Sequence, residues 1–361
     1  MGNNIVIAVD AMGGDKYPES PVIGALMALQ EFPEVFIKLL GDLSVIELEM
    51  AKKTILLRYR KFYSRIIKIE APQIVPMDIK NPTDVLQMPH SSIFVGAGLQ
   101  RLQQADAFVS AGNTGAVMVA ALSRAGRIPG IKRPALAIIM PTKNGPCICL
   151  DVGANAENDV MQLIQFAIMG SIYAQKAQGI SRPRVGLMSV GEEASKGHIK
   201  IKLTNEKLTL LHDRNVINFI GNVQGNDVLA GTADVIVMDG FVGNVVLKMA
   251  EEFIPTLRDA LKKKLHESNP LRKIIAALSF ALLKPTIASI KYDFDYQKYG
   301  GAPFLGVNGV IIKAHGKSTP LAIKNAIGVA RKAAQGQMVI KIREVIEKFP
   351  PDVLQLQPGS K

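Results

Sequence analysis

Short apolar runs recur along the chain, and each ends in a loop of Gly, Asn and Asp residues that opens into a helical pattern. The first run, Ile5 to Val9, precedes the loop that contains Asp10, Gly13 and Gly14. Runs with the same sequel occupy residues 107–109, 147–150, 185–190, 235–238 and 309–313. Strands that alternate with helices indicate βαβ units and a mainly parallel sheet with helices on both faces. The pattern therefore predicts an α/β protein of the three-layer α/β/α class.

The loops after these runs share a chemistry as well as a position. Ligands of parallel sheets bind beyond the carboxyl ends of the strands, where these loops must lie. Glycine lets the backbone approach a ligand, and the start of the next helix offers N–H groups that favour phosphate or carboxylate. Any single loop is explained as well by a tight turn. The set of loops at one edge favours an anionic ligand.

After Asn244 the pattern changes to a long amphipathic helix that reaches about Leu265, then a break at 268–270 and a second apolar stretch to about Ile290. The second stretch repeats its apolar residues on one helical face. These are Leu271, Ile274, Ile275, Leu278 and Leu282, with Phe280 widening the face. An apolar face with basic flanks is typical of a helix at a membrane interface. Packing against a partner subunit or the protein's own core explains it equally well.

The length of 361 residues allows one large α/β domain or two lobes. We expect a single α/β/α domain over residues 1–336, with a protruding helical hairpin inserted at about 245–292. Residues 337–361 are expected to form a C-terminal helix and a flexible tail that begins at Pro350.

The net charge of +12, from 43 Lys and Arg against 31 Asp and Glu, is concentrated in the last third of the chain. Such a balance suits nucleic acid, an anionic membrane or an acidic partner. We set nucleic acid aside because the chain has no zinc-finger spacing, no ribonucleoprotein signature and no Trp. With 48% apolar residues and two cysteines, the chain is expected to be globular and to reside in a reducing compartment.

No export signal or membrane span is expected. The first apolar run stops at Asp10, and the longest candidate span, 274–283, lies between Lys273 and Lys284. A span needs about 20 apolar residues. We therefore expect a cytoplasmic protein.

Several familiar motifs are excluded. Gly316-Lys317-Ser318-Thr319 resembles the end of a P-loop, but its leading glycine is out of register. No dinucleotide fingerprint follows the first strand, and no Gly-x-Ser-x-Gly elbow occurs. The histidines lack metal-ligand spacing, and Cys147 and Cys149 are expected to be buried strand thiols. We expect no metal and no cofactor.

Anion-binding loops without an evident nucleophile suit a reaction in which phosphate itself attacks a carbonyl. The protein then needs to position phosphate, offset its charge and supply donors to the oxyanion. Lys196 could hold phosphate, and Asn244 could donate to the oxyanion. A solvated lysine and an Asn helix cap are the ordinary alternatives.

From Ile7 to about Ala330 the loops resemble those of the bacterial acyl carrier protein–phosphate acyltransferases of phospholipid synthesis. The matching segments are 8–15 (AVDAMGGD), 110–116 (SAGNTGA), 150–155 (LDVGAN), 191–197 (GEEASKG), 239–244 (DGFVGN), 300–302 (GGA) and 315–316 (HG). Departures from the family pattern are His198, Val242 and the pair Met188-Ser189, all at the rim of the expected site.

This resemblance implies a reaction of a long-chain acyl thioester on acyl carrier protein with inorganic phosphate, giving acyl phosphate for glycerol-3-phosphate acylation. It implies a fold like the isocitrate and isopropylmalate dehydrogenases and phosphotransacetylase. It also implies a homodimer whose hairpin meets the inner face of the cell membrane, near a membrane glycerol-3-phosphate acyltransferase. Two rivals are a short-chain phosphotransacetylase that uses coenzyme A and a catalytically idle, membrane-bound scaffold.

The resemblance places the catalytic pair at Lys196 and Asn244. Further candidates for binding phosphate and substrate lie on the matching loops. They are Asp10, Gly13, Gly14, Asn113, Thr114, Gly191, Asp239 and His315. The membrane-facing candidates are the six apolar residues of the second hairpin stretch.

Overall fold

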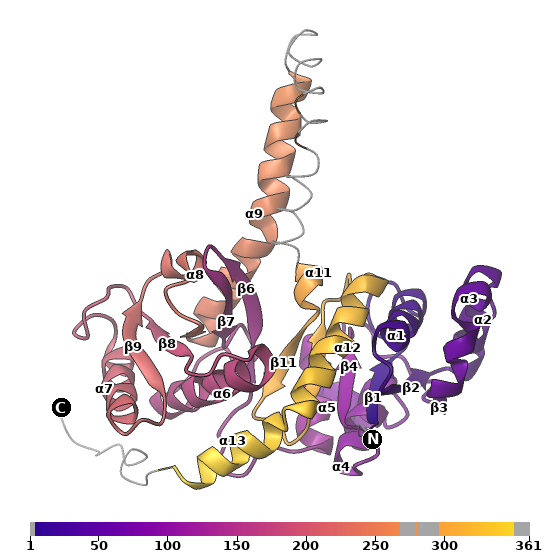
Figure 1. The fold of residues 1–361 in the computed structure, drawn as a ribbon, viewed down its shortest axis with the longest axis horizontal. Helices are drawn as coiled ribbons and strands as arrows, with labels where there is room; N and C mark the ends of the chain where they lie inside the picture. Colours follow the sequence, from indigo (N-terminus) through magenta and orange to yellow (C-terminus); the bar gives the residue numbers. More distant parts are fainter. Residues whose placement is uncertain (1–3, 268–278, 280–282, 284–295, 350–361) are drawn as a thin grey trace.

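The computed structural model describes residues 4–267, 279, 283 and 296–349. Figure 1 shows two groups of strands side by side, each covered by helices, with helix α9 (Gly240–His266) rising away from the body. The two groups are separate sheets of seven and five strands.

The seven-stranded sheet is mainly parallel. In order across the sheet its strands are β3 (Ile66–Glu70), β2 (Val35–Gly41), β1 (Ile5–Asp10), β4 (Ala107–Ser110), β12 (Ile311–Ala314), β11 (Gly301–Leu305) and β5 (Ala135–Leu136). The strands from β3 to β12 run parallel, and β11 is antiparallel to both of its neighbours. The carboxyl ends of β1, β4 and β12 therefore lie side by side.

The five-stranded sheet follows the same plan. Its order is β6 (Ile138–Thr142), β7 (Gly145–Leu150), β10 (Val235–Val237), β8 (Arg184–Met188) and β9 (Asn218–Val223). Only β6 is antiparallel among these described strands. The carboxyl ends of β7, β10 and β8 form a second row of loops.

The helices cover both faces of the sheets. Beside α9 they are α1 (Glu19–Glu31), α2 (Leu43–Met50), α3 (Lys53–Tyr59), α4 (Ser92–Arg101), α5 (Thr114–Arg124), α6 (Val160–Gln178), α7 (Ile199–Asp213), α8 (Asp227–Ala230), α11 (Tyr296–Tyr299), α12 (Pro320–Gln335) and α13 (Met338–Glu347). Two short 3-10 helices, η1 (Arg60–Arg65) and η2 (Pro82–Gln87), connect them.

Strand β1 shows why the fold has three layers. Ile7 and Val9 are buried in one apolar cluster with α1 and α12, whereas Ala8 is buried in the other with α4 and α5. Because alternate residues of a strand point to opposite faces, a strand buried on both faces is apolar throughout. The predicted three-layer α/β fold with a mainly parallel sheet is confirmed, and the strands are divided between two sheets.

Helix α6 forms much of the core of the second sheet and also packs against α12 and α13. Its start is fixed by a capping box, in which Asp159 accepts from the Gln162 N–H and Gln162 accepts from the Asp159 N–H. Its end is fixed by Gly179 in the left-handed region at φ 75°. This helix joins the packing of the two sheets.

Helix α9 confirms the predicted long helix after Asn244 and contains Pro255. Leu271, Ile274, Ile275, Leu278, Phe280 and Leu282 lie outside the described residues. Among the helices that the structure describes, we find none that is both long and apolar enough to span a bilayer. The expected C-terminal helix is α13, which a turn at Gly336 and Gln337 separates from α12. The single-domain assignment of 1–336 stays a prediction, and the tail from Pro350 lies outside the description.

Candidate active site

The loops after β1, β4 and β12 form a closed group, which we call the first loop cluster: residues 10–15, 110–115 and 315–318. The Asp10 carboxylate accepts from the Met12 N–H at 2.9 Å and from the Ser110 hydroxyl at 2.6 Å. Ser110 Oγ in turn accepts from the Gly112 N–H at 3.0 Å. The Asp15 N–H donates to the Gly316 carbonyl at 2.8 Å. These bonds bind the three loops to one another.

Gly13 and Gly14 are required by the crowding of the first loop cluster. A Cβ atom on Gly13 would lie 2.3 Å from Asp10 Oδ2 and 2.7 Å from the Gly112 nitrogen. Gly14 has φ of +90° and faces the Gly316 carbonyl. Both glycines therefore let the β1 loop approach the loops of β4 and β12.

A buried pair of opposite charges lies at the base of this cluster. Asp10 is 1% exposed and Lys313 is 8% exposed. Burial raises the pKa of the Asp10 carboxyl, against the lowering effect of its hydrogen bonds. Burial lowers the pKa of Lys313 to about 8, although Asp10 and Asp15 act in the opposite direction. Lys313 donates to the Ala314 carbonyl, directly before His315.

Asn113 and Thr114 stand at the start of α5. The Asn113 side chain caps the helix by accepting from the Ala116 N–H at 3.1 Å, and it donates to the Met77 carbonyl at 2.9 Å. The first N–H groups of a helix have no partner within it. The Asn113 cap serves Ala116, so the N–H groups of Thr114 and Gly115 have no partner within the helix, and the Thr114 side chain beside them is exposed.

The loops after β7, β8 and β10 form what we call the second loop cluster: residues 151–158, 189–200 and 239–244. Asp151 is fully buried and accepts from the backbone N–H groups of Leu136, Ala154 and Asn155. Desolvation raises the pKa of its carboxyl. A Cβ on Gly243 would lie 1.9 Å from the Asp151 carbonyl oxygen. The start of α9 is thus pressed directly against the β7 loop.

This close approach sets the position of Asn244. A Cβ on Gly153 would lie 3.2 Å from Asn244 Cβ and 3.3 Å from Asn244 Oδ1. The Asn244 side chain is exposed and hydrogen-bonds to no other residue that the structure describes. Its amide is therefore available to a ligand at the edge of the Gly153 loop.

Asp239 connects the starts of α7 and α9. Its carboxylate forms an ion pair with Lys200 at 2.6 Å and accepts from the N–H groups of Asn158 at 3.3 Å and Phe241 at 3.2 Å. Asn158 also accepts from the Gly240 N–H at 2.8 Å. The Asp239 oxygens are thus occupied by the protein's own donors. The sequence analysis missed Lys200, which lies four residues after Lys196 and 39 residues before its acid partner.

Lys196 lies on the loop that leads into α7. Its N–H donates to the Glu193 carbonyl at 3.0 Å, and its side chain folds over Gly191, where a Cβ would lie 2.9 Å from Lys196 Cγ. The side chain is exposed and makes no ion pair with the residues described. Its ammonium group is therefore free to meet an anion. His198, the departure from the family pattern, is the exposed N-cap residue of α7 and makes no capping bond with its side chain.

Helix α9 joins the two clusters. One turn beyond Asn244, Lys248 pairs with Glu251 at 2.7 Å, and Glu251 lies 3.8 Å from His315 Nε2. His315 Nδ1 accepts from the Lys317 N–H at 3.1 Å. Burial is the main cause that lowers the His315 pKa, which favours the neutral ring, although Glu251 acts in the opposite direction. The sequence analysis missed Lys248, Glu251 and Lys313; the lysine inside an apolar strand was the one available signal.

The structure thus brings Asp10, Gly13, Gly14, Asn113, Thr114 and His315 together in the first loop cluster, and Gly191, Lys196, Asp239 and Asn244 in the second. Cys147 and Cys149 are buried thiols of β7, as predicted. The described residues contain no group of three or more His, Cys, Asp or Glu side chains arranged for a metal ion.

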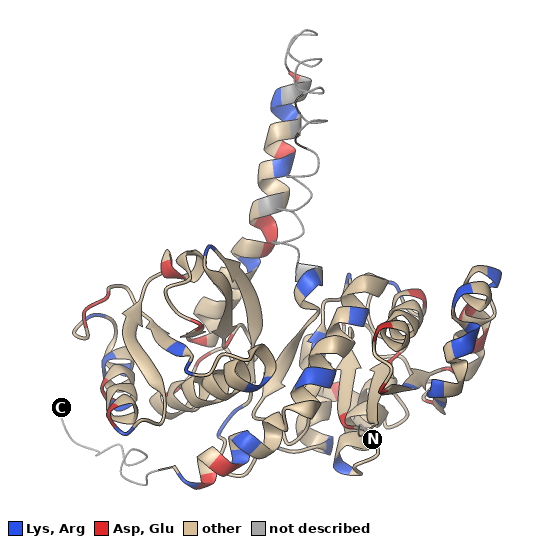
Figure 2. Ribbon diagram, viewed as in Figure 1, with Lys and Arg blue, Asp and Glu red and all other residues tan. Residues whose placement is uncertain are grey.

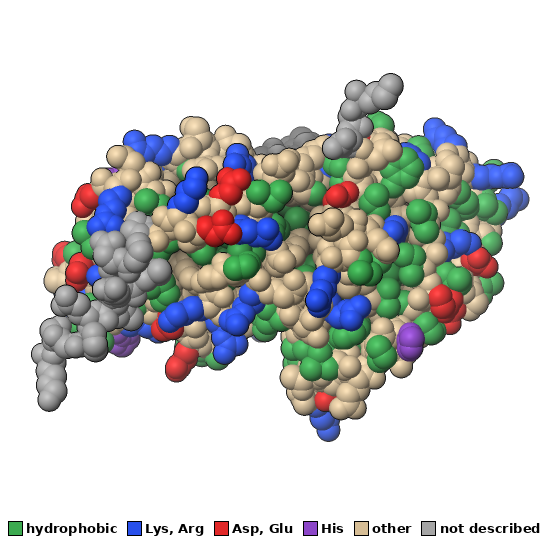
Figure 3. Space-filling model, turned by 90° about the horizontal axis from the view of Figure 1, so that it is seen from below, with side chains coloured by type: hydrophobic (Ala, Val, Ile, Leu, Met, Phe, Trp, Pro, Cys, Tyr) green, Lys and Arg blue, Asp and Glu red, His purple; other side chains and the backbone are tan. Residues whose placement is uncertain are grey.

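Charge elsewhere on the surface is unevenly spread. Figure 2 shows Lys and Arg gathered at the α3 end of the body, and basic and acidic residues alternating along α9. Leu56, Leu57, Arg58, Arg60 and Lys61 line a hollow on α3 and η1. On the face opposite α9, basic and acidic side chains are interspersed (Figure 3).

Known proteins resemble the chain over almost its full length. A family model described as "Fatty acid synthesis protein" matches residues 5–341. A phosphate acyltransferase of Halothermothrix orenii is 41% identical over 343 residues, which cover 95% of this chain and 98% of that protein. A phosphate acyltransferase of Clostridium perfringens is 40% identical over 342 residues, covering 95% and 97%.

Solved structures show a related fold. A phosphotransacetylase from Staphylococcus aureus has a TM-score of 0.59 at 18% identity, covering 92% of this chain and 94% of that one. One from Streptococcus pyogenes has a TM-score of 0.58 at 16% identity, covering 91% and 94%. These similarities confirm the phosphotransacetylase-like fold that the sequence predicts.

Proposed function

This chain belongs to the phosphate acyltransferase family, and from that premise we propose that it transfers a long-chain acyl group from acyl carrier protein to inorganic phosphate. At the level of the family it is an acyltransferase of lipid synthesis. The products are acyl phosphate and the free carrier thiol, and the acyl phosphate feeds phospholipid synthesis.

In the proposed reaction a phosphate oxygen attacks the thioester carbonyl carbon. The resulting oxyanion collapses, breaks the carbon–sulfur bond and releases the carrier thiolate, which takes up a proton. Phosphate is already anionic at neutral pH, so the protein needs to orient it and to compensate charge rather than to activate it. Lys196 offsets the phosphate charge, and the Asn244 amide donates to the oxyanion.

The observation that carries this proposal is the state of these two side chains. Lys196 and Asn244 are exposed and unpaired with described residues, whereas Asp10 of the first loop cluster and Asp151 and Asp239 of the second are occupied by hydrogen bonds or an ion pair. The amides of the Gly191 loop and of the α5 start near Asn113 and Thr114 add donors for phosphate. Gly13 and Gly14 keep the β1 loop close, and Asp10, Asp239 and His315 order the loops.

The test is phosphate-dependent release of carrier thiol from a long-chain acyl carrier protein. Lys196→Ala should lower the rate by about 10³-fold with an unchanged circular dichroism spectrum, because a charge-compensating group at the reacting phosphate is lost. Lys202→Ala, an exposed lysine of α7, is the matched control. Near-normal turnover of folded Lys196→Ala would contradict the assignment.

The same assay separates the rivals. A short-chain phosphotransacetylase would prefer acetyl-CoA to the long-chain carrier substrate. A catalytically idle scaffold would release no thiol when phosphate is added.

We further propose that the protein is a homodimer attached to the inner face of the cell membrane through the hairpin, close to a membrane glycerol-3-phosphate acyltransferase. Support comes from α9, which leaves the body (Figure 1) and exposes Met249, Phe253, Leu257 and Leu261 by 69, 64, 58 and 48%. Flotation with anionic vesicles should weaken with salt and be lost when Ile275 and Leu278 become Asp. Variants that turn monomeric but still bind vesicles would assign the hairpin to dimerisation instead.

A further inference from the structure

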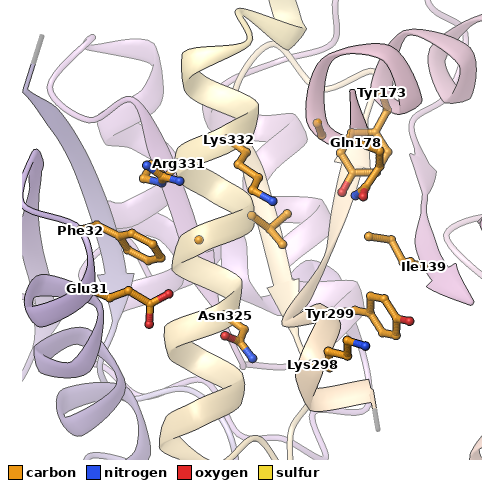
Figure 4. A pocket seen from close by; sticks show the side chains of 13 residues that line it. Glu31, Phe32, Ile139, Tyr173, Gln178, Lys298, Tyr299, Asn325, Arg331 and Lys332 are labelled. Atoms are coloured by element: carbon orange, nitrogen blue, oxygen red, sulfur yellow. The ribbon is translucent and has the colours of Figure 1, made fainter. Parts of the chain in front are cut away.

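A groove away from both loop clusters crosses α12 and has a volume of about 320 Å³ (Figure 4). Glu31, the last residue of α1, and Phe32, which follows it, lie on one side of α12, and Ile139 of β6 and Tyr173 of α6 lie on the other. Helices α1 and α12 pack on the seven-stranded sheet, whereas β6 and α6 belong to the five-stranded sheet. The groove therefore lies where the layers of the two sheets meet, and its volume suits a small molecule.

Two buried hydrogen-bond donors of the groove lack partners. Tyr173 Oη and Arg331 Nε are buried and bond to no other atom of the described chain. Tyr173 is 0% exposed, and the Gln178 side chain is near enough to act on its pKa but not in hydrogen-bonding geometry with its hydroxyl. A buried donor without an acceptor costs about 1–3 kcal/mol, so native proteins rarely leave one unexplained. An acceptor-bearing ligand beside Lys332 would satisfy the Tyr173 hydroxyl, whereas Arg331 Nε lies on the Phe32 side of α12.

The groove is also positively charged. Its acidic residue, Glu31, is already paired with Lys324 at 2.8 Å, and Arg331 is paired with Glu34 at 2.5 Å. Lys332 is exposed, has no ion pair with a described residue, and reaches from α12 toward the Tyr173 side (Figure 4). A negative group between Lys332 and Tyr173 would therefore meet donors and a free cation.

Apolar side chains form part of the remaining wall, beside the polar Gln178 and Asn325. Phe32, Ile139, Ala177 and Val329 line the groove, and the Arg331 guanidinium stacks over the Phe32 ring at 4.5 Å. A bare inorganic ion would leave these apolar side chains in contact with water. An organic body would cover them, at a gain of roughly 25 cal/mol per Å² of apolar area.

We propose that this groove is an effector site for a small organic anion that carries a phosphate or carboxylate head and a short apolar or aromatic body. The head lies between Lys332 and Tyr173, and the body lies against Ile139 and Val329. A ligand placed there contacts α12 and α6 together and so holds the two sheets, whose loops form the candidate active site, in one arrangement. Binding to the folded state alone raises thermal stability.

The test is calorimetric titration of the full chain with phenyl phosphate, hexanoate and inorganic phosphate. Lys332→Met removes the free cation and keeps the aliphatic stem, and Tyr173→Phe removes only the unpaired hydroxyl. Each should weaken binding of the organic probe about fivefold or more. Lys176→Met, an exposed lysine of α6 that does not line the groove, should leave affinity unchanged.

Tyr173→Phe carries a second readout. Because the wild-type hydroxyl is buried and unpaired, its removal should leave the melting temperature of the ligand-free protein unchanged or higher. Comparison of the affinities for phenyl phosphate and hexanoate shows whether the groove prefers a phosphate or a carboxylate group. Organic-probe affinity that is equal in wild type, Lys332→Met and Tyr173→Phe would overturn the site. If inorganic phosphate bound as tightly as phenyl phosphate, the proposed contact between an organic body and the apolar wall would be wrong.

Discussion

The two loop clusters use the same strand-to-helix architecture for opposite purposes. In the first, Asp10 and Lys313 are 1 and 8% exposed, and hydrogen bonds close the loops around the Asp10 carboxylate. In the second, Lys196 and Asn244 are exposed and unpaired with described residues, although Asp151 and Asp239 beneath them are fully bonded. Buried charges thus order the loops, and the groups left free are those suited to chemistry.

The contrast between the two loop clusters is tested most strongly at Asn244, a free side chain of the second cluster. Asn244→Ala should lower kcat for acyl phosphate formation by about 10²–10³-fold, because one donor to the developing oxyanion is lost. The urea midpoint should stay the same, since the side chain is exposed. Thr256→Ala, an exposed position about three turns further along α9, should leave both quantities unchanged. A folded Asn244→Ala enzyme with normal kcat would remove Asn244 from the mechanism.

The first cluster should show its effect in stability rather than in rate. Lys313 has a folded pKa of about 8 against 10.5 in the unfolded chain, so between these values the unfolded state binds more protons. The free energy of unfolding of the wild type should therefore rise with pH from about 8 to 10.5, relative to Lys313→Met, by up to about 3 kcal/mol. Below pH 8 both states are protonated and the difference becomes constant.

Urea unfolding at pH 7, 8, 9 and 10 measures this difference. Lys53→Met, an exposed lysine of α3, is the control and should follow the wild-type pH dependence. Parallel curves for wild type and Lys313→Met would mean that the buried lysine does not titrate in this range.

The smallest effect is expected at the connection between α7 and α9. Lys200→Met leaves the Asp239 carboxylate, whose side chain is 15% exposed, without its ion pair. We expect about a tenfold loss of kcat/KM and a loss of about 1 kcal/mol of stability, because the pair is partly solvated and other donors remain. Lys202→Met should have neither effect. A Lys200→Met loss of stability with unchanged kcat/KM would make the pair purely structural.

The sequence predicted the loops better than the sheets. Apolar runs such as 5–9 and 107–109 are local signals, and they became β1 and β4 with nearly the predicted bounds. The edge of the seven-stranded sheet depends on β11 pairing antiparallel with β5, between residues such as Phe304 and Leu136 that are far apart in the sequence. Local periodicity carries no information about such pairing.

The same limit applies to the site. Lys196 and Asn244 lie in recognisable loops, whereas the role of Lys200 follows only from its ion pair with Asp239, 39 residues away. Glu251 likewise meets His315 only through the packing of α9 beside the β12 loop. Contacts between distant elements are set by tertiary packing, so a single sequence does not display them.

Pro255 divides α9 into an inner part that contacts the body and an outer part beyond it. Proline lacks an N–H donor and interrupts the helical hydrogen-bond ladder, so bending concentrates there. Before Pro255 the helix contacts the body at Gly240, Gly243 and Glu251, and the outer end of α9 rises away from the body (Figure 1). We therefore expect a sideways force on the outer part of α9 to bend the helix at Pro255 and to displace the inner part, which carries Asn244, less.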